Sequence, residues 1–147
     1  MTAELHASLD WSGLEMLDFE ECYQHLRDGA VGRLGFMDRG EPVILPINYA
    51  IDGHSVVFRT APGSKLAQGV MQRPVCFEID SWDLLDHTGW SVLLKGVADE
   101  VLGDDEIDHL ESLPVRPWSR PDLRRSWVRI MAEEVTGRRI VATPVEE

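Results

Sequence analysis

The 147-residue sequence has only two cysteines, no long apolar run and no excess of positive charge. Cys22 and Cys76 lie far apart, without the spacing of a disulfide framework or a Cys-x-x-Cys site, so we expect buried free thiols in a reducing cytoplasm. No apolar stretch approaches the roughly 20 residues of a membrane span. The first ten residues carry Glu4 and Asp10 and no lysine or arginine, so they lack the basic n-region of a signal peptide. These absences predict a cytoplasmic protein.

Positive charge is scarce: 14 Lys and Arg stand against 26 Asp and Glu, which gives a net charge of −12 and a pI of about 4.7. A chain this acidic is unlike proteins that bind nucleic acid or an anionic membrane. We therefore expect neither partner. An anionic ligand would need a local cationic pocket.

The common catalytic motifs are also missing. The five histidines are scattered, and none belongs to an H-E-x-x-H or Cys/His cluster, so we expect no metal site. The sequence has no G-x-S-x-G elbow, no P-loop and no dinucleotide fingerprint. These absences exclude the nucleophilic hydrolase and nucleotide-binding folds that such motifs mark.

What the chain does contain is a 44% apolar content, enough for one core. Residues 1–15 show weak periodicity and are expected to form an N-terminal arm, and residues 16–147 a single domain. A helix is predicted at 18–29, because Asp18 and Glu21 resemble a capping box and Gly29 is a stop signal. Its apolar stripe runs at i, i+3, i+4 and i+7 through Phe19, Cys22, Tyr23 and Leu26.

The rest of the chain reads mostly as short strands. They are predicted at 31–37, 41–51, 55–60, 75–80, 89–101 and 127–135, and a short seventh at 138–142 could pair back after a turn at 136–137. Pro46 must lie at an edge, a bulge or a ligand, and Gly96 indicates a bulge or sharp bend. Helices are predicted at 65–72 and, with a cap, at 104–112, an acidic loop at 81–87, and a proline-rich irregular segment at 113–123. This order favours a small closed antiparallel β-barrel decorated with helices.

One corner, F-R-T-A-P-G-S-K at residues 58–65, is a candidate anion site. Pro62 and Gly63 turn the chain from strand to helix, and Ser64 suits the N-cap. Lys65 and Arg59 bring positive charge, and the hydroxyls of Thr60 and Ser64 add donors, so the corner can bind a phosphate. The alternative is an ordinary strand–turn–helix corner with a solvated lysine.

The order of these elements resembles a known family. The helix ends in D-G-A-V-G-R-L, the hairpin P-V-I-L-P-I-N-Y-A-I-D-G follows, and the corner F-R-T-A-P-G-S-K comes next. Further on are V-C-F-E-I-D and G-W-S-V-L-L-K-G. From about residue 16 to residue 140 the chain resembles the pyridoxamine 5′-phosphate oxidase-like, FMN-binding split-barrel superfamily, in its small single-domain bacterial branch.

The resemblance implies a six-stranded antiparallel split β-barrel that forms a homodimer with two FMN molecules at the interface. It implies that Arg59 and Thr60 contact the flavin and its phosphate, and that Ser64 and Lys65 form the phosphate corner. By the same resemblance, the strand beside the flavin ring carries Pro46, Ile47 and Asn48. Trp90 and Ser91 begin a strand that approaches the cofactor across the dimer.

The chain departs from the oxidase pattern in two places. Leu66 replaces the second basic residue of the phosphate corner, and residues 129–147 hold no counterpart of the oxidase's substrate-binding arginine and histidine. We therefore expect an FMN-dependent oxidoreductase acting on another small organic substrate. The alternative is a non-catalytic protein that binds flavin, a deazaflavin coenzyme or haem on the same barrel. Trp118 is interpreted either as a lid over the flavin or as a packing anchor.

Overall fold

The computed structural model describes residues 9, 13–115 and 117–141, except for the side chain of Lys65. Most of the predicted arm and Ala142 lie outside these residues. Over the described residues the chain forms eight strands and three helices. In chain order they are β1 (Glu15–Leu17), α1 (Phe19–Asp28), β2 (Val31–Asp38), β3 (Glu41–Asn48), β4 (Ala50–Asp52), β5 (Ser55–Thr60), α2 (Lys65–Val70), β6 (Pro74–Asp83), β7 (Thr88–Glu100), α3 (Asp104–Glu111) and β8 (Ser126–Ile140).

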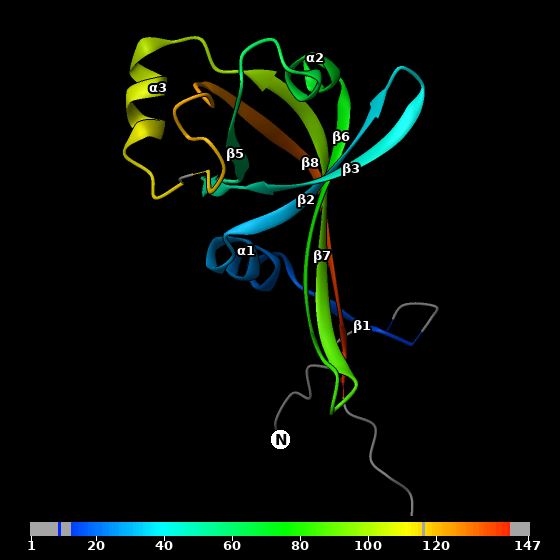
Figure 1. The fold of residues 1–147 in the computed structure, drawn as a ribbon. Helices are drawn as coiled ribbons and strands as arrows, with labels where there is room; N and C mark the ends of the chain where they lie inside the picture. The colour runs from blue at the N-terminus through cyan, green and yellow to red at the C-terminus, as the bar shows by residue number, and fades with distance from the viewer. Residues whose placement is uncertain (1–8, 10–12, 116, 142–147) are drawn as a thin grey trace, which may run out of the picture.

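All the strands belong to one antiparallel sheet, which curls into a half-barrel (Figure 1). Its order is β3-β2-β6-β7-β8-β5-β4, with β1 paired to β8. The predicted strand at 41–51 is bent at Tyr49, so that β3 pairs with β2 while β4 pairs with β5 at the opposite edge. The mostly β split barrel is confirmed. Its six longer strands match the expected number, and β1 and β4 are additional three-residue strands.

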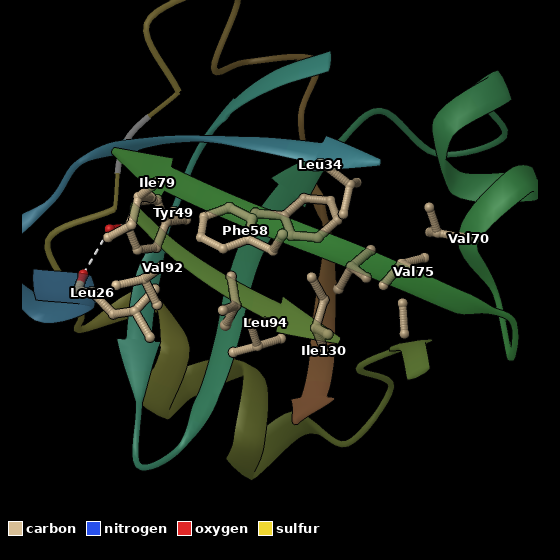
Figure 2. Close-up of a cluster of buried hydrophobic side chains, with 14 of the residues drawn as sticks. Leu26, Leu34, Tyr49, Phe58, Val70, Val75, Ile79, Val92, Leu94 and Ile130 are labelled. Carbon is tan, nitrogen blue, oxygen red and sulfur yellow. Dashed lines mark hydrogen bonds between the residues drawn. The ribbon is translucent and has the colours of Figure 1, made fainter. Parts of the chain in front are cut away.

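The inner face of the curled sheet holds the main core. Phe58, Leu34, Leu94 and Ile130 have no exposed surface and face one another across the half-barrel (Figure 2). Alternating strand residues supply these side chains, because successive residues of a strand point to opposite faces.

A second, smaller core lies under α3. Val57, Leu110 and Trp127 are buried there together with Val101 and Val115. Residues 55–58 are therefore buried on both faces of β5. The strand lies between the main core and the cover formed by α3 and the proline-rich segment that follows it.

The predicted N-cap residues are found at two of the three described helices. Asp18 accepts the amide of Glu21 at 2.8 Å, and Ser64 accepts the amide of Ala67 at 3.1 Å. The cap predicted for α3 is wrong, because the N-cap is Gly103, which has no side chain to accept an amide. Acidic residues fill the first turn of α3 instead, where the helix dipole favours them.

The end of the chain is one strand rather than two. The turn predicted at 136–137 is wrong, because β8 continues through both residues and pairs with β7 as far as Ile140. Gly137 is required by packing: a Cβ there would lie 2.6 Å from Cys22 Sγ and 3.0 Å from Leu17 Cδ1. A glycine at this position lets α1 and β1 approach the strand.

The β6–β7 hairpin is longer than predicted. β6 continues to Asp83, so only residues 84–87 of the predicted acidic loop turn the chain, and the hairpin extends from the body as an arm (Figure 1). The bulge predicted at Gly96 is confirmed. The register shifts between Lys95 and Gly96, whose partners are Glu134 and Ala132, so Glu133 is the extra residue.

Both cysteines are free, as predicted. Cys22 is buried, and burial raises the pKa of its thiol. Cys76 is only partly buried, contrary to the prediction, because it lies on the outer face of the sheet. In the described part of the chain, no helix has both the length and the apolar composition to cross a membrane.

Candidate functional site

A groove of about 490 Å³ lies between edge strand β3 and the proline-rich segment, which as described in the structure comprises residues 112–115 and 117–125 between α3 and β8. Most of its wall is apolar, and its polar groups come from four side chains. The lining residues are Val31, Leu45, Pro46, Ile47, Asn48, Arg59, Leu66, Pro117, Trp118, Ser119 and Arg124. Its size and composition are those of a small-molecule site.

Strand β3 supplies three of the predicted site residues, Pro46, Ile47 and Asn48. Pro46 pairs with Arg33 of β2 and cannot donate to a strand on its other side, which is why it is tolerated at the sheet edge. The edge placement predicted for Pro46 is confirmed. It leaves this side of β3 open to the groove.

Arg59 enters the groove from β5. Its Nε donates to the carbonyl of Arg124 at 2.8 Å, and a terminal amine donates to the carbonyl of Pro121 at 3.4 Å. Its guanidinium also lies 5.6 Å from the ring centroid of Trp127, within cation–π range. Arg59 therefore fixes the proline-rich segment against the sheet as well as lining the groove.

Asn48 makes a second attachment to that segment. Its side-chain oxygen accepts the backbone amide of Trp118 at 3.0 Å, while the indole of Trp118 is 78% exposed. The exposed indole does not support the packing-anchor interpretation. Its position on the groove wall agrees with the lid interpretation, which remains a prediction.

The predicted phosphate corner adjoins Arg59 along the chain. The hydroxyls of Thr60 and Ser64 are 3.1 Å apart, and Ser64 also caps α2. The two hydroxyls share one hydrogen bond, so one hydroxyl hydrogen is left over. Thr60 is only 1% exposed, so it is the Ser64 hydroxyl that can donate to a ligand, when Thr60 donates within the pair. Lys65 begins α2, and its side chain is outside the described part of the structure.

Trp90 and Ser91 are not brought to this groove. Trp90 stacks on His25 of α1, with ring centroids 3.7 Å apart, and burial lowers the pKa of His25. Ser91 follows Trp90 in β7 and therefore points to the other face of the sheet, where its strand neighbours are Asp80 of β6 and Arg138 of β8. An approach of these two residues to a cofactor of a second chain remains a prediction of the resemblance.

The charges of the groove differ from those of the whole protein. Its described lining contains Arg59 and Arg124 and no carboxylate, in a chain of net charge −12. It also contains no histidine, cysteine, methionine or tyrosine, the residues that ligate haem iron. This set of side chains suits an anionic, largely planar organic ligand, and the described lining offers no axial ligand to haem iron.

Sequence reasoning did not identify Arg124 or Leu66 as site residues, and it left the role of Trp118 open. Arg124 and Trp118 lie in an irregular segment without periodicity. The available signal was the segment itself, because long irregular loops in compact domains are usually functional.

The residues that match a family model span all of the barrel except β1 and the last residue of β8. The model of the pyridoxamine 5′-phosphate oxidase family matches residues 18–139. The chain belongs to this family. Helix α1, the groove and nearly all of β8 fall within the match, so the resemblance drawn from the motifs is confirmed.

Solved structures and curated sequences include similar proteins. An FAD-binding protein of Mycobacterium smegmatis is 32% identical, with a TM-score of 0.73, over 84% of this chain and 96% of its own. A protein of unknown function from Corynebacterium diphtheriae is 34% identical, with a TM-score of 0.74, over 87% of this chain and 98% of its own. An uncharacterised Mycobacterium tuberculosis protein is 32% identical over 131 residues, covering 86% of this chain and 85% of its own.

Proposed function

We propose that the chain is a flavoprotein that binds FMN or FAD in the groove between β3 and the proline-rich segment, and that it is an oxidoreductase acting on a small organic compound. One observation carries the proposal: an apolar groove with two arginines and no carboxylate in its described lining, in an acidic protein. The FAD-binding relative from M. smegmatis, at 32% identity, supports the choice of a flavin.

The side chains of the groove fit such a cofactor. Pro46, Ile47 and Leu66 offer apolar contact to a planar ring, and Arg59 offers guanidinium donors to a phosphate. The Thr60 and Ser64 hydroxyls, which adjoin Arg59 along the chain, add one further donor. A bound flavin supplies the two-electron redox chemistry, and the protein supplies binding, orientation and electrostatics. The apolar wall would exclude water from one side of the ring.

A non-catalytic flavin-binding protein is the second candidate. The described lining of the groove has no side chain that titrates near neutral pH, so nothing there serves as a general acid or base. A protein that stores or senses flavin needs no such group. Redox turnover distinguishes the two functions, because only the enzyme bleaches its flavin when a substrate is added.

We further propose that the protein is a cytoplasmic homodimer that binds neither nucleic acid nor membrane. The outer face of the sheet carries an apolar hollow of about 530 Å³ beside Ile44, which is 70% exposed, and Met37. An obligate dimer would bury on the order of 2,000 Å² or more. Two free thiols suit a reducing compartment.

The decisive experiment is a titration of the purified apo protein with FMN, FAD and riboflavin, followed by flavin fluorescence. We expect FMN and FAD to bind more tightly than riboflavin. Removing a charge-assisted contact to phosphate by Lys65→Ala or Arg59→Ala should weaken FMN by roughly 10- to 150-fold and riboflavin far less. Arg73→Gln, an exposed arginine outside the groove lining, is the control. Absence of binding by all three flavins would refute the flavoprotein assignment.

A further inference from the structure

Several of the twelve arginines of this chain are paired with carboxylates in the part that the structure describes. Five of them make ion pairs within 4 Å: Arg27, Arg33, Arg120, Arg129 and Arg139. The two that line the groove do not pair in this way. Among the described residues, Arg59 and Arg124 make their side-chain hydrogen bonds to backbone carbonyls.

The two groove arginines differ in how many donors they have left. Arg59 uses Nε and a terminal amine on the carbonyls of Arg124 and Pro121. Arg124 uses only Nε, which donates to the carbonyl of Ser119 at 2.8 Å. Its two terminal amines make no hydrogen bond to any described residue, so they form a fork of donors held in place by the Nε bond.

The surroundings of this fork favour an anion. The described lining contributes no carboxylate, and a second guanidinium belongs to the same groove. The two positively charged guanidinium groups repel each other in a partly apolar groove, and a bound anion would offset this repulsion. A guanidinium fork binds phosphate and carboxylate oxygens in pairs, which gives both affinity and orientation.

We infer that Arg124 is an anion-binding residue of the groove and that it takes a phosphate or carboxylate group of the ligand. The inference rests on the proposed function for the identity of the groove as the ligand site. Two sources can supply the same chemistry: the phosphate tail of the flavin, or a carboxylate on the second reactant.

The test compares Arg124→Gln with wild type and with the control Arg125→Gln. Arg125 is the next residue along the chain, and its side chain is exposed and outside the groove lining, so the control removes the same charge without changing the groove. Apo protein is titrated with FAD, FMN and riboflavin. If the anion belongs to the flavin tail, Arg124→Gln should weaken FAD or FMN by roughly 10- to 150-fold and riboflavin by less than about threefold.

If the anion belongs to the second reactant, flavin affinities should stay unchanged. Protein saturated with FMN is then titrated with benzoate and with neutral benzamide, read from the bound flavin's absorbance. Arg124→Gln should lose benzoate binding by a comparable factor and keep its response to benzamide. Unchanged affinities for all flavins and for benzoate would overturn the inference while leaving the flavoprotein assignment intact.

Two further measurements keep the outcome decisive. If Arg124→Gln fails to fold, as judged by its thermal midpoint, Arg124→Lys replaces it, since lysine keeps the charge and loses the fork. If wild type binds no flavin, the proposed function fails, and inorganic pyrophosphate is tested as the probe. A midpoint raised by pyrophosphate in wild type but not in the variant supports the inference, and equal shifts in both overturn it.

Discussion

The hydroxyl of Tyr49 joins the bend between β3 and β4 to the end of helix α1. It donates to the carbonyl of Leu26 at 2.7 Å, and both side chains are buried (Figure 2). Leu26 is in the last turn of α1, where carbonyls lack partners within the helix. Tyr49→Phe therefore removes the described partner of a buried acceptor while keeping the aromatic ring.

We expect Tyr49→Phe to lower the free energy of unfolding by about 1–3 kcal/mol, the cost of leaving a buried polar group unsatisfied. For a chain of this length that corresponds to a fall of roughly 3–10 °C in the thermal midpoint. Tyr23→Phe is the matched control, because Tyr23 donates at the same 2.7 Å to the carbonyl of His54, an exposed residue where water can replace the hydroxyl. Its loss should be smaller.

Alkaline pH gives an independent reading of the same residue. Burial raises the pKa of Tyr49 to about 12 from the ordinary 10.0, with a smaller contribution from Asp28. The unfolded chain therefore releases this proton first, and the stabilisation present below pH 10 is lost as the pH rises from about 10 to 12. Tyr49→Phe should lack this part of the alkaline loss. Calorimetry that shows Tyr49→Phe equal to or milder than Tyr23→Phe would refute the reasoning.

Three other predictions test the packing, the electrostatics and the assembly. Gly137→Ala should destabilise the fold by about 1–3 kcal/mol in urea unfolding, because its Cβ would lie 2.6 Å from Cys22 Sγ. Gly103→Ala is the control, because its Cβ would meet only Glu106 Cβ, at an ordinary contact distance of 4.0 Å. The hydrogen bond from His109 holds the pKa of Asp52 below its ordinary 3.8, with help from Arg129. The stabilisation from ionised Asp52 is therefore complete above about pH 3.8 and is lost as the pH falls below that value. In acid unfolding, Asp52→Asn should lack this pH-dependent loss of stability. Sedimentation should show a dimer at micromolar concentration that Ile44→Glu disrupts, while Leu102→Glu, exposed on the turn before α3, leaves it intact; a monomeric wild type would contradict the assembly.

The elements with complete local signals were predictable. The strand at 55–60 lies between a D-G turn and a P-G turn and carries a continuous apolar run, and its predicted bounds are those of β5. The cap of α1 was equally legible, because Asp18 and Glu21 act within one turn. The signal at 136–137 misled, because threonine followed by glycine is typical of turns. Here the glycine is needed for contact with Cys22, a residue more than a hundred positions away.

The candidate site was predictable on its strand side and not on its loop side. Pro46 and Arg59 come from regular strands whose order resembles the family, and the fold brings them to one groove. Trp118 and Arg124 depend on the path of an irregular segment. That path is fixed by hydrogen bonds from Asn48 and Arg59, which no local pattern reveals.

The extra residue in β8 also determines which changes in chain length the barrel can accept. Successive side chains of a strand point to opposite faces of the sheet. The extra residue Glu133 interrupts this alternation, so Ile130 and Gly137 are both buried although they are seven positions apart. Deleting Glu133 would restore plain alternation and leave every later side chain on its present face. Deleting Thr136 would instead move Arg138 into the place of Gly137, against Cys22. The two deletions lie only three positions apart. Deleting Glu133 shortens the strand without changing which side chains are buried, whereas deleting Thr136 places a charged side chain beneath α1.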